Sequence, residues 1–152
     1  MALKRAGKIR HYGVSNLDRA DMQELWTIPG GAGTQTDQVL YNLARRESER
    51  SLLPWLRERH IPVMAYSPIE QANLVRNAGL RGFAEKHGMT AAQAALAWLL
   101  ASDDIIVIPK TGRRDRLKEN LGALDHPLTQ TPLAELDRLF PPPSGPRPLE
   151  ML

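Results

Sequence analysis

A regular alternation of short apolar runs with segments of helical periodicity constrains the fold more than any other feature of this chain. Four apolar runs predict strands, at residues 8–14, 36–42, 61–67 and 105–108. Helical patterns follow them, the clearest at residues 19–26, 79–88, 90–102 and 113–124. Strands that alternate with helices in this way form βαβ units, whose strands lie parallel in one sheet. The sequence therefore predicts an α/β fold.

The ends of the chain's elements and its domain organisation follow from local signals. Thr90 and Gln93 have the spacing of a capping box at the start of a helix. A last helix is predicted from Thr131, and the Pro-rich segment 141–152 is predicted to be a nonhelical tail. No linker-like segment divides the chain, so residues 1–152 are expected to form a single domain.

Composition excludes several classes of function. The 152 residues contain no cysteine, which removes disulfides, thiolate nucleophiles and cysteine-ligated metals. The four histidines lack the spacing of metal ligands, so no metal site is predicted. A net charge of +3 suits an anionic ligand but is too small to indicate nucleic acid. With no apolar run long enough for a signal peptide or a membrane span, a cytoplasmic location is the default expectation.

The fourth apolar run leads into the most strongly charged segment of the chain. Residues 105–108 read Ile-Ile-Val-Ile without polar alternation, so this strand is expected to be buried on both faces. The next segment, "PKTGRRDRLKEN", carries five cationic side chains within nine residues. Two interpretations are open for it, a solvated helix face or a clamp for an anion.

Polar side chains follow every predicted strand. In parallel α/β sheets, ligands bind at the carboxyl ends of the strands. Amides and hydroxyls suit a carboxamide, the face of a tyrosine suits a flat ring, and lysine suits phosphate. The first strand is followed by Ser15 and Asn16, and Gln38 lies within the second strand, which then gives Tyr41 and Asn42. The third strand gives Tyr66 and Ser67, and the fourth gives Lys110 and Thr111. This set favours a dinucleotide site, although the glycine-rich GxGxxG loop is absent.

Each of these residues also has a purely structural interpretation. Ser15 and Asn16 could form a turn and a cap, and Gln38 could satisfy backbone groups. Tyr66 could be a core aromatic with its hydroxyl at the surface. Taken singly, most of the residues favour the structural interpretation, whereas the ordered set favours a cofactor site. A solvated helix face is expected for three of the cations, Arg113, Arg114 and Lys118.

Four segments resemble, in order, the second half of the aldo-keto reductases. They are "GKIRHYGVSN", "DQVLYNL", "IPVMAYSPI" and "IPKTGRRDRLKEN". The segment "LLPWLRERHIPVMAYSP" and the Pro-rich tail are most similar to bacterial members of the methylglyoxal reductase kind. The family fold is an eight-stranded (β/α) barrel. The resemblance therefore implies the C-terminal half of a TIM barrel, with four βα units, a C-terminal helix and a Pro-rich tail.

The resemblance also implies an activity and a cofactor, since the family reduces aldehydes and ketones to alcohols with NADPH. At the nicotinamide end, Ser15, Asn16 and Gln38 would hold the carboxamide, and Tyr66 would stack on the ring. Small carbonyl compounds would be the substrates of the complete enzyme, and the sequence does not identify which one.

The rest of the nucleotide would follow the later strands. By the same resemblance, Ser67 and Ile69 would line the path of the pyrophosphate. The adenosine 2′-phosphate would be gripped by Lys110, Thr111 and Arg116. Two residues would lie near the adenine, Glu119 and Asn120. This implied role favours the anion clamp over the solvated face for "PKTGRRDRLKEN".

Family catalysis is implied to use a Tyr acid, a Lys, an Asp and a His, all located before the "GVSN" segment. None of the chain's tyrosines, Tyr12, Tyr41 and Tyr66, matches the catalytic motif. No catalytic residue is therefore assigned, and the chain alone is expected to be inactive. Gene truncation, proteolysis and an incomplete record all remain open as reasons. The alternative function is a non-catalytic nucleotide-binding or assembly module derived from the barrel.

Half a barrel would leave two unpaired sheet edges, at residues 8–14 and 105–108. Apolar edge strands recruit other chains, and an open half-barrel exposes apolar side chains. We expect self-association into a dimer or a soluble aggregate, or pairing with a missing N-terminal half. A shifted helix could instead cover the sheet and give a flavodoxin-like monomer.

Overall fold

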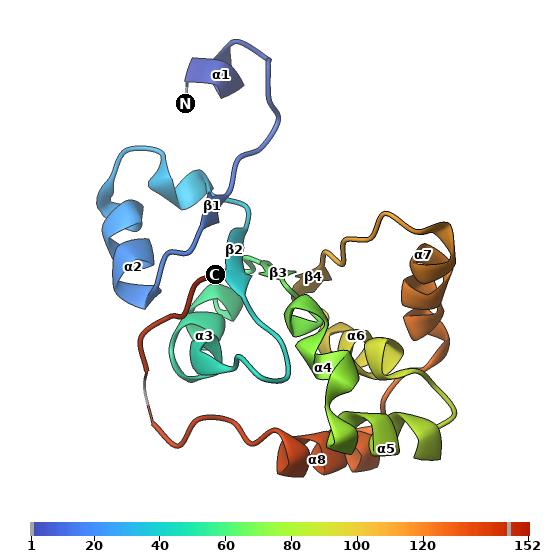
Figure 1. The fold of residues 1–152 in the computed structure, drawn as a ribbon. Helices are drawn as coiled ribbons and strands as arrows, with labels where there is room; N and C mark the ends of the chain where they lie inside the picture. Colours follow the sequence, from blue (N-terminus) through green and yellow to red (C-terminus); the bar gives the residue numbers. More distant parts are fainter. Residues whose placement is uncertain (1, 146) are drawn as a thin grey trace.

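Four parallel strands form one sheet in the computed structural model, which describes residues 2–145 and 147–152 (Figure 1). They are β1 (Val14–Ser15), β2 (Asp37–Leu40), β3 (Val63–Tyr66) and β4 (Ile105–Val107). Their order in the sheet is β1-β2-β3-β4, and each neighbouring pair is parallel. All carboxyl ends therefore lie at the same edge of the sheet. The predicted α/β fold with a parallel sheet is confirmed.

Helices connect and follow these strands. A short helix precedes β1, namely α1 (Ala2–Arg5). After β1 and β2 come α2 (Arg19–Thr27) and α3 (Leu52–Arg57). Between β3 and β4 lie α4 (Asn73–Arg76), α5 (Ala78–Lys86) and α6 (Ala91–Leu100). After β4 come α7 (Arg114–Leu121) and the C-terminal helix α8 (Gln130–Leu139). The described residues of the tail contain no helix, as predicted.

Side-chain caps explain where two of the helices begin. The Asp18 carboxylate accepts hydrogen bonds from the N–H groups of Ala20 and Asp21, at 2.7 and 2.9 Å, ahead of α2. Asp21 returns a bond to the Asp18 N–H at 3.1 Å. At α6, Thr90 and Gln93 form the predicted capping box, with bonds of 3.2 and 2.9 Å. Each cap satisfies backbone N–H groups that have no partner inside the helix.

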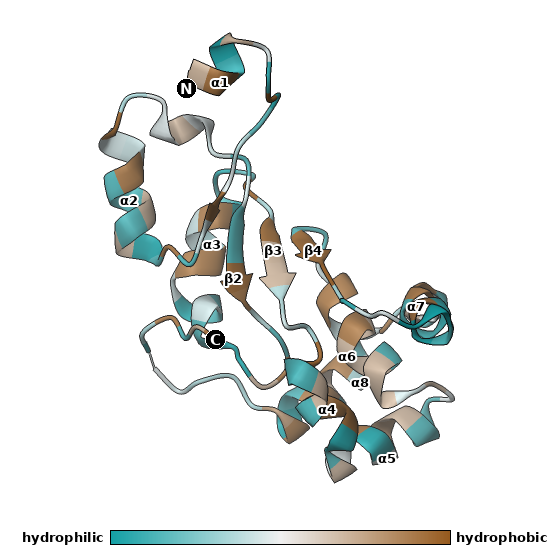
Figure 2. Cartoon of the chain, turned by 45° about the horizontal axis from the view of Figure 1, so that its top comes forward, coloured by the Kyte–Doolittle hydropathy of each residue, from teal (hydrophilic) through white to brown (hydrophobic). Residues whose placement is uncertain are grey.

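The two faces of the sheet have different surroundings. Alternate residues of β2 and β3 point to one face, where Val39, Val63 and Ala65 are almost wholly buried. They belong to a core that includes residues of α3 and α6, and Figure 2 shows the apolar α6 beside β4. On the opposite face, Gln38 and Met64 are only partly buried. The hydrophobic core therefore lies between one sheet face and the helices.

The expectation that residues 105–108 are buried on both faces was wrong. Ile105 is 8% exposed, whereas Ile106 is 41% and Ile108 is 36% exposed. Ile105 packs in the core beneath the helices, and Ile106 lies in the same cross-strand row as Met64 on the other face. β4 is also the last strand of the described sheet. An apolar run without alternation therefore marks two buried faces only where layers cover both.

The first strand is shorter than predicted. Only Val14 and Ser15 of this region pair in the sheet, whereas a strand was expected over residues 8–14. Residues 8–11 are exposed and extend away from the sheet toward α1 (Figure 1). Val14 lies opposite Asp37, the first residue of β2, so residues before Val14 have no β2 residue opposite them in the parallel register. Self-association through the β1 and β4 edges stays a prediction.

Asp37 is a buried acid in the middle of the sheet. Its side chain is wholly buried, and neither carboxyl oxygen has a hydrogen-bond partner among the described residues. Burial raises the pKa of Asp37 from 3.8 to about 6, although the Leu17 backbone lowers it somewhat. The folded state binds the Asp37 proton more tightly than the unfolded state does, so the protonated carboxyl stabilises the fold. This stabilisation is fully present below the unfolded pKa of 3.8. It is lost as the pH rises through about 6.

We therefore expect Asp37→Asn, which cannot ionise, to be more stable than the native chain by about 1–3 kcal/mol at pH 8. At pH 4 the native carboxyl is protonated, so the two proteins should have nearly equal free energies of unfolding. Urea denaturation of both proteins at the two pH values measures the difference. A gap of the same size at both values would show that ionisation of Asp37 does not destabilise the fold.

Candidate cofactor-binding site

The pairing of β1 with β2 brings together the first group of predicted site residues. Ser15 lies opposite Gln38 in the parallel register. The Ser15 hydroxyl and the Asn16 N–H both donate to the Gln38 carbonyl, each at 2.9 Å. The Gln38 side-chain amide reaches the next strand and donates to the Met64 sulfur at 2.9 Å. Because sulfur is a weak acceptor, this amide is held without a strong partner.

Asn16 combines backbone strain with an unsatisfied polar atom. Its φ of 58° lies in the left-handed region, which non-glycine residues rarely occupy. Its side-chain Oδ1 is buried and accepts no hydrogen bond from any described residue. A buried acceptor without a partner is disfavoured, and the N–H of a ligand carboxamide would satisfy it. The residues present at this end of the sheet therefore fit a carboxamide group.

Tyr66 ends β3 and opens a loop of unusual conformation. Its hydroxyl accepts a hydrogen bond from the Leu152 N–H at 3.4 Å, so the end of the chain lies beside it. The C-terminus lies near β2 and α3 in Figure 1. Four residues after Tyr66 have φ values between 48° and 72°, namely Ser67, Glu70, Gln71 and Ala72. The predicted pyrophosphate residues Ser67 and Ile69 thus belong to a strained loop.

The cationic segment forms the connection from β4 to α7. Lys110 is exposed, and the Thr111 hydroxyl accepts a hydrogen bond from the Arg113 N–H at 3.1 Å, just before the helix. Arg116 forms an ion pair with Glu119 at 2.6 Å along the helix. The helix N-terminus adds positive partial charge to that of Lys110. Two of the predicted adenosine residues, Arg116 and Glu119, therefore already pair with each other.

Other residues of this segment contact α6 or lie on the surface. Asn120 is partly buried, and the Glu119 carbonyl accepts a hydrogen bond from Gln93 of α6 at 3.1 Å. Arg113 pairs with Asp115 at 2.6 Å on the surface. The side chains predicted to form a solvated face are all exposed, namely Arg113, Arg114 and Lys118. Lys110 is exposed and Thr111 is partly exposed in the connection that precedes α7.

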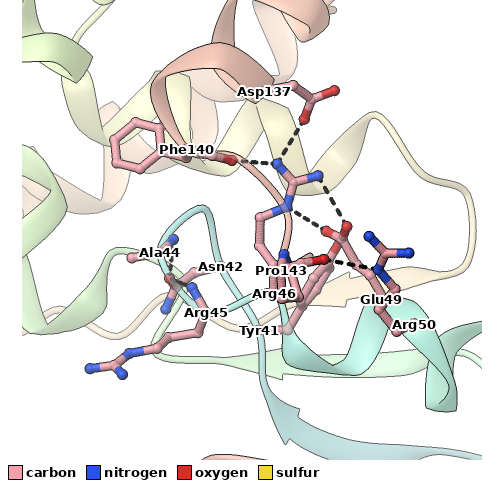
Figure 3. Close-up of polar contacts among 10 residues, drawn as sticks. All are labelled: Tyr41, Asn42, Ala44, Arg45, Arg46, Glu49, Arg50, Asp137, Phe140 and Pro143. Atoms are coloured by element: carbon pink, nitrogen blue, oxygen red, sulfur yellow. Dashed lines mark hydrogen bonds and ion pairs between the residues drawn. The ribbon is translucent and has the colours of Figure 1, made fainter. Parts of the chain in front are cut away.

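Sequence reasoning missed two charged clusters that flank the loop after β2. Arg45 binds the buried Glu70, and Arg46 binds Glu49 and Asp137. The two arginine side chains leave the chain in different directions (Figure 3). Their partners lie far along the chain, for example Asp137 for Arg46, and no sequence pattern links such distant residues. Asn42, noted at the end of the second strand, was the only sequence signal for either cluster.

Tyr12 and Tyr41 donate their hydroxyl groups to partners within the fold. The Tyr12 hydroxyl donates to the Gly30 carbonyl, and the Tyr41 hydroxyl donates to Glu49 at 2.9 Å. Burial, reinforced by the negative charge of Glu49, raises the pKa of Tyr41 well above its usual value. A phenol shifted in this direction is a poor proton donor at neutral pH.

The described residues contain neither a cluster of metal ligands nor a membrane-spanning helix. No group of three or more His, Cys, Asp or Glu side chains there could hold a metal ion. None of the helices in residues 2–145 and 147–152 is long and apolar enough to cross a membrane.

Comparison with known proteins shows to which family the chain belongs. The profile of the Aldo/keto reductase family matches residues 1–140. The chain belongs to this family. A methylglyoxal reductase of Escherichia coli (strain K12) is 44% identical over 151 residues, which cover 96% of this chain and 53% of the relative. A glyoxal reductase of Bacillus subtilis (strain 168) is 32% identical over 151 residues, covering 99% of this chain and 53% of the relative.

Solved structures agree with this assignment. An aldo-keto reductase from Klebsiella pneumoniae in complex with NADPH superposes with a TM-score of 0.95 at 42% identity, covering 99% of this chain and 55% of that one. A second structure of an aldo/keto reductase from this organism, with NADP and acetate, matches equally well. The chain spans about half the length of the relatives it matches. Its four βα units correspond to part of the family's TIM barrel, as the resemblance implied, and the likeness to methylglyoxal-reductase-type members is confirmed.

Proposed function

We propose that this chain is the NADPH-binding portion of an aldo-keto reductase that reduces aldehydes or ketones to alcohols. One observation carries the proposal: the buried Asn16 Oδ1 at the end of β1, which accepts no hydrogen bond from any described residue. It lies in a chain that superposes on an NADPH complex with a TM-score of 0.95. The exposed Lys110, at the end of β4, supports the same assignment. The 44% identity with a methylglyoxal reductase favours small dicarbonyl compounds as substrates of the whole protein.

The residues would hold the cofactor in three places. At the nicotinamide end, Ser15, Asn16 and Gln38 would bind the carboxamide through their hydroxyl and amide groups. Tyr66 would offer its ring face to the nicotinamide. Along the path of the pyrophosphate would lie the loop after β3, with Ser67 and Ile69. At the adenosine end, the ligands would be Lys110, Thr111, Arg116, Glu119 and Asn120.

The chemistry requires a hydride and a proton. When bound, NADPH supplies the hydride that reduces a carbonyl group. The alkoxide that forms must then be protonated by a group tuned to donate at neutral pH. Tyr41 is unsuited to this, because its environment raises its pKa. We therefore propose that this chain positions the cofactor and contributes no proton donor of its own.

Cofactor titration and turnover together test the proposal. We expect the purified chain to quench or shift NADPH fluorescence on binding, with NADPH bound more tightly than NADH. Incubation with NADPH and methylglyoxal should give no oxidation above the rate without protein. Absence of NADPH binding to the folded chain would contradict the proposed function. Sustained turnover that is lost in Tyr41→Phe would show that Tyr41 serves as the acid after all.

A non-catalytic module is the second candidate function. The exposed Ile106 on the uncovered sheet face favours an assembly role over catalysis. The intact mass of the protein from its source, together with the coding sequence upstream of Met1, separates the two candidates. An in-frame Tyr and Lys of the catalytic kind upstream would support the enzyme. Their absence, with NADPH binding retained, would support the module.

A further inference from the structure

Glu70 is a buried acid at the turn that follows the loop after β3. It is 7% exposed, and both of its carboxylate oxygens are bound. Oε1 accepts from the Arg45 Nε and Nη2 atoms, each at 2.9 Å. Oε2 accepts from the Asn42 amide at 2.8 Å. A buried carboxylate of this kind is stable only while such partners neutralise it and fill its lone pairs.

The same partners reach the start of the loop. The Asn42 amide also donates to the Ser67 carbonyl at 2.9 Å. Asn42 is wholly buried, and its Oδ1 accepts from the N–H groups of Ala44 and Arg45 at 2.8 and 3.1 Å. The turn from residue 42 to residue 45 is thus rigidly fixed beside β2. Side chains of this turn bind both ends of the segment from Ser67 to Glu70 through hydrogen bonds and an ion pair.

These contacts bind a segment whose backbone conformation is disfavoured for residues other than glycine. Ser67, Glu70, Gln71 and Ala72 all have positive φ values, and none of them is glycine. Left-handed non-glycine residues persist only where the surrounding contacts hold them. Within the loop, backbone bonds from Glu70 to Ser67 and from Ala72 to Ile69, at 2.9 and 3.0 Å, support the conformation only locally. Asn42 and Arg45 add hydrogen bonds and an ion pair from a distant part of the chain.

Arg45 differs from its neighbour Arg46 in what it connects. Arg46 points toward Glu49, Asp137 and the Phe140 carbonyl, whereas Arg45 points away from that cluster (Figure 3). The remaining Arg45 nitrogen, Nη1, pairs with Glu150 of the C-terminal tail. The guanidinium is therefore held between one anion in the loop and one in the tail.

We propose that Arg45 is a positioning residue of the nucleotide site, which fixes the left-handed loop 67–72 in its binding conformation by bridging Glu70 and Glu150. This inference rests on the proposed function, in which Ser67 and Ile69 line the path of the pyrophosphate. Arg45 touches no part of that path itself. It acts through Glu70: the guanidinium binds the Glu70 carboxylate, and this contact fixes a residue whose backbone is left-handed.

Hydrogen exchange in the ligand-free chain tests the positioning directly. In Arg45→Gln, the Glu70 and Ala72 amides should exchange about tenfold faster than in the native chain, because local opening of the loop becomes easier. The control is Arg57→Gln, which removes an exposed ion pair with Asp104 elsewhere on the surface. Exchange in the loop should not change in the control. Unchanged protection of Glu70 and Ala72 in folded Arg45→Gln would overturn the proposal.

Nucleotide affinity supplies the second readout. NADPH should bind Arg45→Gln about tenfold more weakly, because the loop is no longer fixed by the charged hydrogen bonds to Glu70. Arg45→Lys, which keeps the charge but not the planar pair of donors, should fall between the native chain and Arg45→Gln in both readouts. It serves as the deciding variant if Arg45→Gln does not fold, and native behaviour in Arg45→Lys would then overturn the proposal.

The two readouts separate this inference from the proposed function. A native chain that does not bind NADPH, with loop exchange still accelerated in Arg45→Gln, contradicts the proposed function and leaves Arg45 as a purely structural residue. A native chain that binds NADPH, with affinity unchanged in Arg45→Gln, contradicts the positioning role and leaves the proposed function intact.

Discussion

Arg46→Met should lower the free energy of unfolding by about 3–5 kcal/mol, the loss expected when one partner of a buried charge network is removed. The Arg46 side chain is 9% exposed. Its Nε and Nη2 atoms donate to Glu49 at 2.7 and 3.0 Å. Its Nη1 donates to Asp137 at 2.7 Å and to the Phe140 carbonyl at 2.6 Å (Figure 3). Truncation would leave these acceptors without their donor.

The aromatic neighbours of Arg46 increase the expected loss. The Arg46 guanidinium lies 5.0 Å from the centre of the Trp98 ring. Tyr41, which packs at 5.3 Å from Trp98, donates its hydroxyl to the same Glu49. Loss of Arg46 would therefore leave the Glu49 carboxylate without its cationic partner and beside the Tyr41 ring. It would also release the end of α8, which Arg46 ties to the loop after β2.

Arg57→Met is the matched control for this substitution. Arg57 pairs with Asp104 at 2.7 Å, but its side chain is 56% exposed. Surface ion pairs contribute roughly 0.2–1 kcal/mol, so this variant should lose only that much. Urea denaturation at neutral pH compares the two variants with the native chain. Similar small losses in both would show that the Arg46 network does not stabilise the fold.

Lys110→Met should weaken NADPH binding by about 1.5–3 kcal/mol while leaving NADH binding nearly unchanged, because one charged hydrogen bond to phosphate is lost. NADPH differs from NADH by the 2′-phosphate, which the proposed site places against Lys110 and Thr111. Lys110 is exposed just ahead of α7, whereas Arg116 is already paired with Glu119. Lys110 should therefore contribute more to this discrimination than Arg116.

Lys118→Met provides the control for charge alone. Lys118 is an exposed cation of α7 to which no contact with the cofactor is assigned. Both variants lower the net charge equally, so a general electrostatic effect would weaken NADPH binding in both. Fluorescence titration with each nucleotide distinguishes the outcomes. Equal losses for NADPH and NADH in Lys110→Met would refute the assignment of Lys110 to the 2′-phosphate.

Local signals predicted the elements of this fold well. The alternation of apolar runs and helical patterns gave the parallel sheet, and the Thr90 and Gln93 spacing gave the start of α6. These features depend on residues close together in the chain. The burial of residues 105–108 was not predictable in the same way, because exposure of Ile106 depends on which layers cover the sheet. β1 was overestimated in length because its pairing depends on β2.

In the candidate site, too, features set by local sequence were predicted and features set by distant contacts were not. The proximity of Ser15 and Asn16, at the end of β1, to Gln38 within β2 follows from the order of the strands. The support beneath the site was missed, because Arg45 contacts Glu70 and Glu150, at separations of 25 and 105 residues. Ion pairs over such distances leave no periodic trace in a single sequence. The left-handed conformation of Glu70 was equally hidden, since nothing about glutamate indicates a positive φ.

Chemical-shift mapping of NADPH on the isotope-labelled chain tests the central claim most directly, since it locates the nucleotide without relying on turnover. The account predicts that the largest shifts fall at the carboxyl ends of β1, β2 and β3 and at the loop before α7, including the amides of Asn16, Gln38 and Thr111. Shifts confined to the helix-covered side, around Tyr41 and Trp98, would contradict the proposed cofactor site.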